Sequence, residues 1–190
     1  MNAARILAAA FAGGLVATAA VAQTTVPLAN FDSIELRGGG HVILRHGPQQ
    51  HVTILKGSTQ FTTFEMRDSH KLVIDACNTD CPANYNLEIE IVTPDVHAVA
   101  ISGGGAIESA PGFPAQGSVA AAVDGGGKID IRNVAAQNGT AAVNGGGHIE
   151  IRANGHLTAA VNGGGKIGYV GNPQVATAID GGGSVSREGG

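Results

Sequence analysis

A triplet of glycines recurs five times at nearly even spacing, and this repeat constrains the fold more than any other feature of the chain. The triplets begin at Gly103, Gly125, Gly145, Gly163 and Gly181, so the spacings are 22, 20, 18 and 18 residues. Self-similarity at a fixed period near 20 residues is typical of stacked repeat architectures. We therefore expect glycine-rich corners that recur once in every repeat of about 18–22 residues.

The residues around each triplet repeat as well. In the second copy, Val123 and Asp124 precede the triplet and Ile129 follows it by two residues, and similar residue types fill these positions in the other copies. Alternation of apolar and polar residues indicates β-strands. Two topologies fit: a parallel β-helix whose columns stack on themselves, or a meander with a hairpin at each Asn-Gly or Asp-Gly. Matched columns favour the all-β parallel β-helix, or β-solenoid.

The N-terminus has the features of a secretory signal peptide. Arg5 precedes an apolar run over residues 6–20, and small residues at Ala20 and Ala22 form a cleavage site. The run is shorter than the roughly 20 residues that a membrane-spanning helix needs. We therefore predict a signal peptide over residues 1–22 and an exported protein, periplasmic in the first instance, with an extracellular or cell-surface location as the alternative.

The rest of the chain, residues 23–190, has a length that suits one domain. We expect a divergent N-terminal part over 23–95 and regular glycine-triplet repeats over 96–190. The chain has 30 glycines, no tryptophan and 4% aromatic residues, so its core must be thin to be filled at normal density. Its net charge of −4 argues against a nucleic-acid partner, and no segment after the signal peptide is long enough to span a membrane.

Two cysteines, Cys77 and Cys81, lie close together in the sequence. Because an exported chain meets an oxidising compartment, we predict that they form a local disulfide.

Three histidines, His41, His46 and His51, also lie close together. Pairing of Val42 with Ile54 in a hairpin would direct them to different faces, so we predict no metal site here. The repeats also depart from the GGxGxD units of calcium-binding β-rolls. We expect no metal and no cofactor.

Outward-facing charges on the strands after two triplets form a predicted contact ladder. If the coils stack, charges of one repeat lie beside those of the next, where opposite charges stabilise a sheet modestly. The ladder consists of Lys128, Asp130, Arg132, His148, Glu150 and Arg152.

The acidic members of this face allow an alternative, catalytic interpretation. Stacked coils would place Glu108, Asp130 and Glu150 about 5 Å apart, near the carboxylate separation of retaining glycosidases. This would make the protein a polysaccharide-cleaving enzyme of the β-helix type. No aromatic platform or enclosing wall is evident, so we favour a solvated charged face without catalysis.

The motifs as a whole resemble a known family. The segments FDSIELRGGGHVIL and VAISGGGAIES, followed by serial AVNGGGKI copies and GYVGNPQVATAIDGGGSV, are similar to the bacterial putative auto-transporter adhesin head domain, called the GIN domain. The resemblance covers about 31–185. It implies an exported, all-β, solenoid-like domain, and adhesion is what the family name suggests. The family supplies no catalytic residues to transfer.

These observations predict a non-catalytic binding or structural module of the cell envelope, adhesin-like in role. Its partner would be an envelope protein or polysaccharide. The last coil, 184–190, has little to cover its edge, so we also expect self-association through this C-terminal edge.

Overall fold

The computed structural model describes residues 23–68, 70–78 and 80–189, which form one 15-stranded β-sheet. The predicted signal peptide, residues 1–22, lies outside the described residues. The described part of the chain contains strands and no helix, so the all-β prediction is confirmed and no helix there could cross a membrane.

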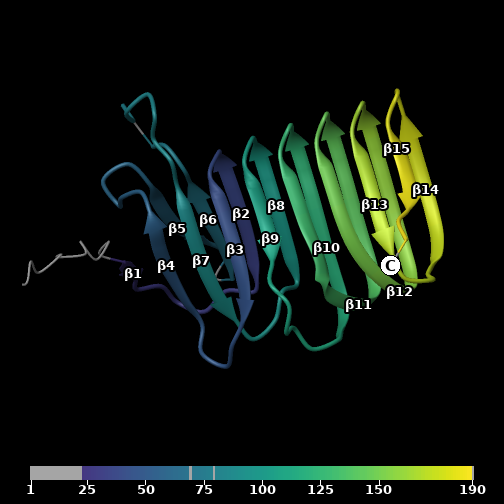
Figure 1. The fold of residues 1–190 in the computed structure, drawn as a ribbon, viewed down its shortest axis with the longest axis horizontal. Coiled ribbons are helices and arrows are strands. Elements are labelled where there is room, and N and C mark those ends of the chain that lie inside the picture. The colour runs from purple at the N-terminus through teal and green to yellow at the C-terminus, as the bar shows by residue number, and fades with distance from the viewer. Residues whose placement is uncertain (1–22, 69, 79, 190) are drawn as a thin grey trace, which may run out of the picture.

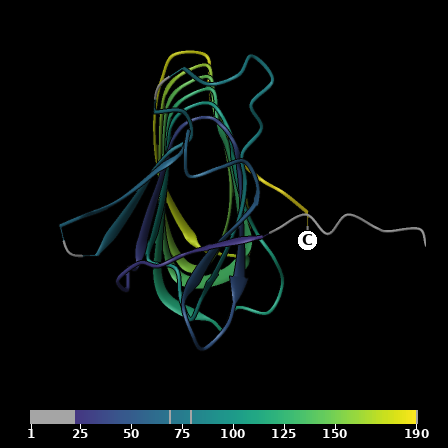
Figure 2. The same ribbon diagram turned by 90° about the vertical axis from the view of Figure 1, so that its left-hand side faces the viewer.

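The sheet curls into two facing walls that meet at the glycine corners (Figures 1 and 2). We call them the ascending wall, most of whose strands run toward the corners, and the descending wall, most of whose strands run away from them. The ascending wall contains β2 (Ser33–Gly38), β5 (Thr63–Arg67), β6 (Lys71–Asp75), β8 (Ala98–Gly103), β10 (Gln116–Gly125) and β14 (Gln174–Asp180). The descending wall contains β1 (Thr24–Val26), β3 (His41–His46), β4 (His51–Lys56), β7 (Glu88–Thr93), β9 (Ala106–Ser109), β13 (Lys166–Val170) and β15 (Ser184–Arg187).

Two long strands contribute to both walls. β11 (Lys128–Gly145) and β12 (His148–Gly163) begin in the descending wall, bend, and end in the ascending wall. Figure 2, seen along the stack, shows the resulting nested loops with a narrow space between the walls. The sequence predicts a separate strand on each side of a glycine corner. It does not predict what lies at the opposite end of the repeat, where one continuous strand links one repeat to the next.

The strands of successive repeats pair in parallel, in the register that the glycine repeat predicts. Gly125 lies beside Gly103 on one side and Gly145 on the other, and Gly163 follows Gly145. Each repeat therefore has its counterpart as its immediate neighbour across the sheet.

The corners require glycine because successive backbones approach closely. Gly145 has φ of +113°, and a Cβ atom there would lie 2.8 Å from the carbonyl oxygen of Gly125. That same oxygen accepts a hydrogen bond of 3.0 Å from the N–H of Gly146. A side chain at the first glycine would thus both strain the backbone and displace this contact. Nothing lies within 4 Å of a Cβ at the middle glycine, Gly146.

The core is the narrow space between the walls, filled by columns of small branched side chains. Each column places one residue directly beside its counterpart in the next repeat, and the members named here are at most 2% exposed. The main columns are Val123, Val143 and Val161 on the ascending wall and Ile129, Ile149 and Ile167 on the descending wall.

The N-terminal part departs from one expected pairing. β7 lies between β3 and β4, so Val42 pairs with Ile89 rather than with Ile54 and the predicted hairpin is wrong. The long loop that precedes β7 carries the predicted disulfide, and Cys77 and Cys81 are bonded. Local alternation of side chains could not reveal that a strand distant in sequence separates these two neighbours.

Candidate functional site

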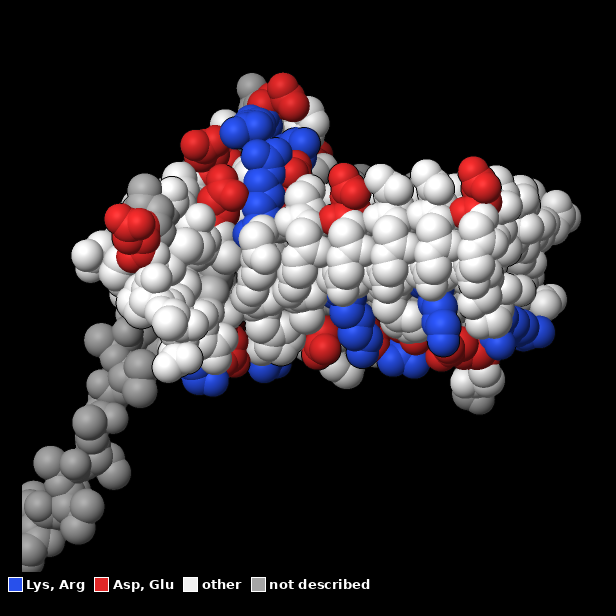
Figure 3. Space-filling view, turned by 90° about the horizontal axis from the view of Figure 1, so that it is seen from above, with Lys and Arg blue, Asp and Glu red and all other residues white. Residues whose placement is uncertain are grey.

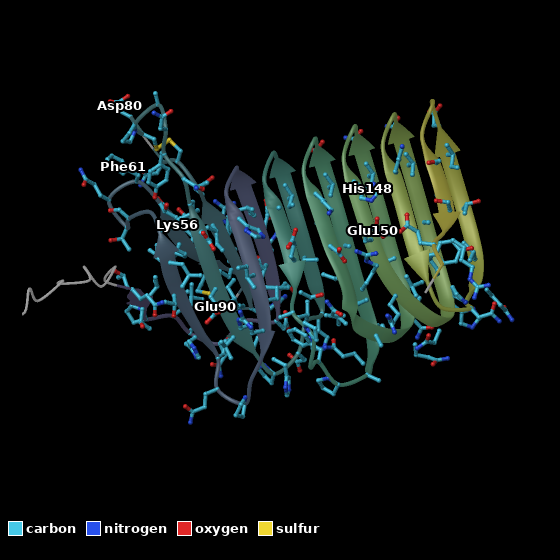
Figure 4. The ribbon with its side chains drawn as sticks, in the orientation of Figure 1. Lys56, Phe61, Asp80, Glu90, His148 and Glu150 are labelled. Carbon is cyan, nitrogen blue, oxygen red and sulfur yellow. A yellow bond between two sulfur atoms is a disulfide. The ribbon has the colours of Figure 1, made fainter. Side chains whose placement is uncertain are left out.

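The predicted contact ladder lies on the outer face of the descending wall. Lys128 pairs with His148, and Asp130 with Glu150, across β11 and β12. Because Ile129 between them points into the core, both pairs point to the outer side of the wall. Figure 4 shows His148 and Glu150 one above the other on this face. The structure thus brings these four residues together as expected.

The two arginines of the ladder do not align. The register shifts after Ile131, so Arg152 lies beside Ala135 instead of Arg132. Arg132 turns back along its own strand and binds Asp130 through two nitrogens, at 3.0 and 2.6 Å. It also lies 3.6 Å from Glu150 and 3.9 Å from Glu188. One guanidinium group therefore faces three carboxylates.

This contact controls the charge of Asp130. Burial raises the pKa of its carboxyl, but hydrogen bonds from the side chain and backbone of Arg132 outweigh burial, so the pKa is lowered overall. The same contact, strongest through Asp130, raises the pKa of Arg132. Asp130 is therefore held ionised as a hydrogen-bond acceptor.

Glu150 is the most buried carboxylate of the ladder, at 7% exposed. Its Oε1 lies 2.6 Å from Nε2 of His148, while its Oε2 has no hydrogen-bond partner among the described residues. Gly168, beside Glu150 on β13, leaves the space that these groups occupy, since a Cβ there would lie 2.9 Å from Glu150 Oε2 and 3.0 Å from Glu188 Oε1. Sequence reasoning missed Gly168 and Glu188. The signal was a glycine standing where the preceding repeats carry Glu108, Asp130 and Glu150.

The acidic column of the catalytic alternative is also assembled. Asp130 pairs with both Glu108 and Glu150, and Glu108 lies 3.6 Å from His41. Glycosidases of the two-carboxylate type need one carboxyl that is protonated and can donate to the leaving group. The lowered pKa of Asp130 opposes that role for the central member of the column.

Three cations on this face remain free. In the described part of the chain, Lys128, Arg152 and Lys166 make no ion pair and no side-chain hydrogen bond, and all three are exposed. Figure 3 shows Lys and Arg side chains among acidic ones along this long edge of the molecule. Arg132 offsets part of the charge of the neighbouring carboxylates, and the three exposed cations add positive charge to the surface of this face.

The ascending wall has a different outer face. A shallow groove of about 590 Å³ crosses five strands, and its outward alanines are small and uncharged. The alanines are Ala100, Ala122, Ala142, Ala160 and Ala178. The sequence contained a signal for this outer face. A valine that points inward stands between an alanine and an Asn or Asp, so both neighbours of the valine point outward. The groove itself was not predicted.

Metal-binding groups are not gathered anywhere in the described part of the chain. No three histidine, cysteine, aspartate or glutamate side chains there could hold an ion together.

Part of the repeat region is similar to a known family. Residues 115–173 match the family described as "Putative auto-transporter adhesin, head GIN domain". The resemblance predicted from the glycine repeats is therefore confirmed over this segment. No curated protein matches the chain.

Several solved structures are similar in outline. An adhesin-titled protein from Bacteroides fragilis is 16% identical with a TM-score of 0.45, and covers 88% of this chain and 96% of its own. A protein titled as lipid binding, from Parabacteroides distasonis, is 15% identical with a TM-score of 0.36 at the same coverage. One titled as a cell adhesion protein, from Clostridium sporogenes, is 10% identical with a TM-score of 0.37, covering 87% and 98%. These scores are too low to support any argument about this chain.

Proposed function

We propose that this protein is an exported, non-catalytic binding module of the cell envelope, adhesin-like in role, and that its contact surface is the charged ladder of the descending wall. The match of residues 115–173 to an adhesin head family supports the class of function. We further propose that the domain spans 23–190 after cleavage of a signal peptide, with 23–95 as a divergent cap and 96–190 as the regular array. In this proposal the protein works in the periplasm or at the cell surface.

The proposed scaffold is a β-solenoid in which each glycine-cornered repeat is one coil. The parallel pairing of Gly125, Gly145 and Gly163 supports it, because a meander would pair neighbouring strands antiparallel. Such a scaffold repeats a surface position at every coil, which suits contact with an extended partner.

One observation carries the proposed binding role: Lys128, Arg152 and Lys166 are exposed and make no ion pair among the described residues, while the neighbouring carboxylates lie against Arg132. An anionic polymer could contact these cations without first breaking a salt bridge. We therefore propose an envelope polysaccharide or protein that carries carboxylate or phosphate groups as the partner. Attraction between exposed charges is screened by salt, so retention should weaken as ionic strength rises.

The test is retention of the purified protein on anionic and neutral fractions of the organism's own envelope. Replacing both Lys128 and Lys166 with alanine should lower retention on the anionic fraction about thirtyfold, since each exposed cation near a polyanion contributes roughly 1 kcal/mol. Lys56→Ala is the matched control, because Lys56 lies on the same wall but pairs with Glu88. Equal retention of the double variant and the wild type would remove the ladder from the proposed contact surface.

The alternative is a polysaccharide-cleaving enzyme that uses Asp130 with Glu108 or Glu150. The adjacency of the three carboxylates favours it. Asp130→Asn separates the two proposals: it should abolish any depolymerising activity if the column is catalytic, and leave it unchanged if the column is structural.

A further inference from the structure

The C-terminal end of the stack exposes apolar side chains that are buried everywhere else. Val175 and Ile179, on β14, are 37% and 47% exposed, and they are the exposed large hydrophobic residues of the described chain. They stand beside Leu157 and Val161, which are 1% and 2% exposed in the core. Among the described residues, no further repeat covers these two core columns.

The backbone at this end is open too. β14 pairs only with β12, and β15 pairs only with β13, so each has one edge without a partner strand among the described residues. Figure 1 shows both strands at the end of the stack farthest from β1. An edge of this kind is a template for pairing with another chain.

The opposite end of the stack has a different character. Val26 and Leu28 pack against the core there, and Phe31 is 6% exposed. Its outermost strands, β1 and β5, each pair antiparallel with a neighbour. Stacking this end on the C-terminal end of another copy would not match one exposed apolar surface with another, so a head-to-tail filament is not favoured.

We propose that two copies associate through their C-terminal ends, tail to tail, about a two-fold axis parallel to the strands. This axis sets β14 of one copy antiparallel to β15 of the other. Ile179 lies three residues before Gly182 and Val185 three residues after it, so both are equally far from the glycine corner. The axis therefore places Ile179 of one copy beside Val185 of the other. Both belong to inward columns, beside Val161 and Ile167. The contact would extend the existing core across the interface.

Charges select this axis over the other two-fold arrangement. Arg187 stands in an inward column, beside Tyr169. Thr177 lies five residues before Gly182 and Arg187 five after it, so the proposed axis sets Arg187 opposite Thr177 of the second copy. A two-fold axis perpendicular to the walls would instead pair β15 with β15 of the second copy, which places both Arg187 side chains in one short antiparallel pair of strands. An inward-pointing charge on an edge strand limits unspecific pairing with other chains. Here Arg187 leaves only the axis parallel to the strands, of these two arrangements, without repulsion between like charges.

This inference goes beyond the proposed function and does not depend on it, because it concerns the end of the stack and not the charged ladder. The two-fold axis would turn the second copy around, so that the dimer presents a charged ladder on both sides. Two ladders on one particle would strengthen attachment to a polymer by avidity.

A cross-linking experiment tests the axis directly. Gly182 would lie close to its counterpart in the second copy, and a Cβ there meets nothing within 4 Å. Oxidised Gly182→Cys should therefore form a covalent dimer, since disulfides need Cα atoms about 6 Å apart. Gly164→Cys is the matched control, with equally open space one repeat earlier, and should stay monomeric. Equal cross-linking of the two variants, or none with Gly182→Cys, would overturn the proposed geometry.

Sedimentation over a concentration series tests the association itself. The wild type should show a reversible monomer–dimer equilibrium. Ile179→Glu should raise the dimer dissociation constant at least about tenfold by placing an unpaired charge in the interface. Ala178→Glu, on the outward face of the same strand, should change it less than about twofold. A monomer at every concentration, a species that grows beyond the dimer, or equal effects of both variants would contradict the proposal.

Discussion

Arg132 binds both carboxylate oxygens of Asp130, with Nε 3.0 Å from Oδ1 and Nη2 2.6 Å from Oδ2. The backbone N–H of Arg132 donates to Oδ1 as well, at 3.3 Å. A carboxylate held by three donors is a structural acceptor, and its lowered pKa leaves it without a proton to donate near neutral pH. The centre of the acidic column is thus organised for charge compensation.

Removing this arginine should destabilise the descending wall. Arg132→Met leaves Asp130, Glu150 and Glu188 without their shared cation, and we expect a loss of roughly 1–2 kcal/mol in the free energy of unfolding at pH 7, a figure reduced because Arg132 is 40% exposed. Urea denaturation would measure it. Arg45→Met is the control, since Arg45 is more exposed and pairs with Glu90 alone. A loss for Arg132→Met no larger than that of the control would contradict the shared-cation role.

Glu35 should make stability depend on pH in the acid range. Burial raises the pKa of its carboxyl, but hydrogen bonds from Arg37 and Lys71 outweigh burial and lower it. A lowered pKa stabilises the fold above the unfolded value of about 4.3, and this contribution is lost as pH falls through the folded value. Glu35→Gln should therefore cost roughly 1 kcal/mol at pH 7 and almost nothing near pH 2.

Denaturation curves at the two pH values would measure this difference. Glu65→Gln serves as the comparison, because the Glu65 carboxylate is half exposed and its pair with Arg67 lies on β5, the outermost strand of the ascending wall. If Glu35→Gln lost as much stability at pH 2 as at pH 7, packing rather than charge would explain the residue.

The first and middle glycines of one corner should differ sharply in tolerance. Gly145→Ala places a Cβ 2.8 Å from the Gly125 carbonyl oxygen at a φ of +113°, and should cost about 2 kcal/mol or more. Gly146→Ala meets nothing within 4 Å and should change stability by less than about 0.5 kcal/mol. Thermal unfolding of the pair would compare them, and similar melting temperatures would mean that the corner relaxes without strain.

Much of the fold could be predicted from the sequence because the repeat is internal. When Gly125, Gly145 and Gly163 recur with matched neighbours, stacking of each repeat on the next follows from the pattern itself. The N-terminal part offered no such guide. β7 enters between β3 and β4 from more than 30 residues away, and only the long-range packing of Ile89 against Val42 reveals it.

The candidate site was predictable in position but not in detail. Alternation placed Asp130 and Glu150 on one outer face, as found. The bend after Ile131 separates Arg152 from Arg132, and the glycine at position 168 admits the side chain of Glu188. Both features depend on backbone irregularity and on a missing Cβ, which residue spacing alone does not encode.

The proposed role of this protein is binding without catalysis, and one incubation tests that role most directly. Purified protein is mixed with the organism's anionic envelope polysaccharide, and retention on the polymer and the length of the polymer chains are measured in the same sample. We predict salt-sensitive retention with the chain length unchanged. Shortening of the polymer that Asp130→Asn abolishes would contradict this account and identify the acidic column as an active site.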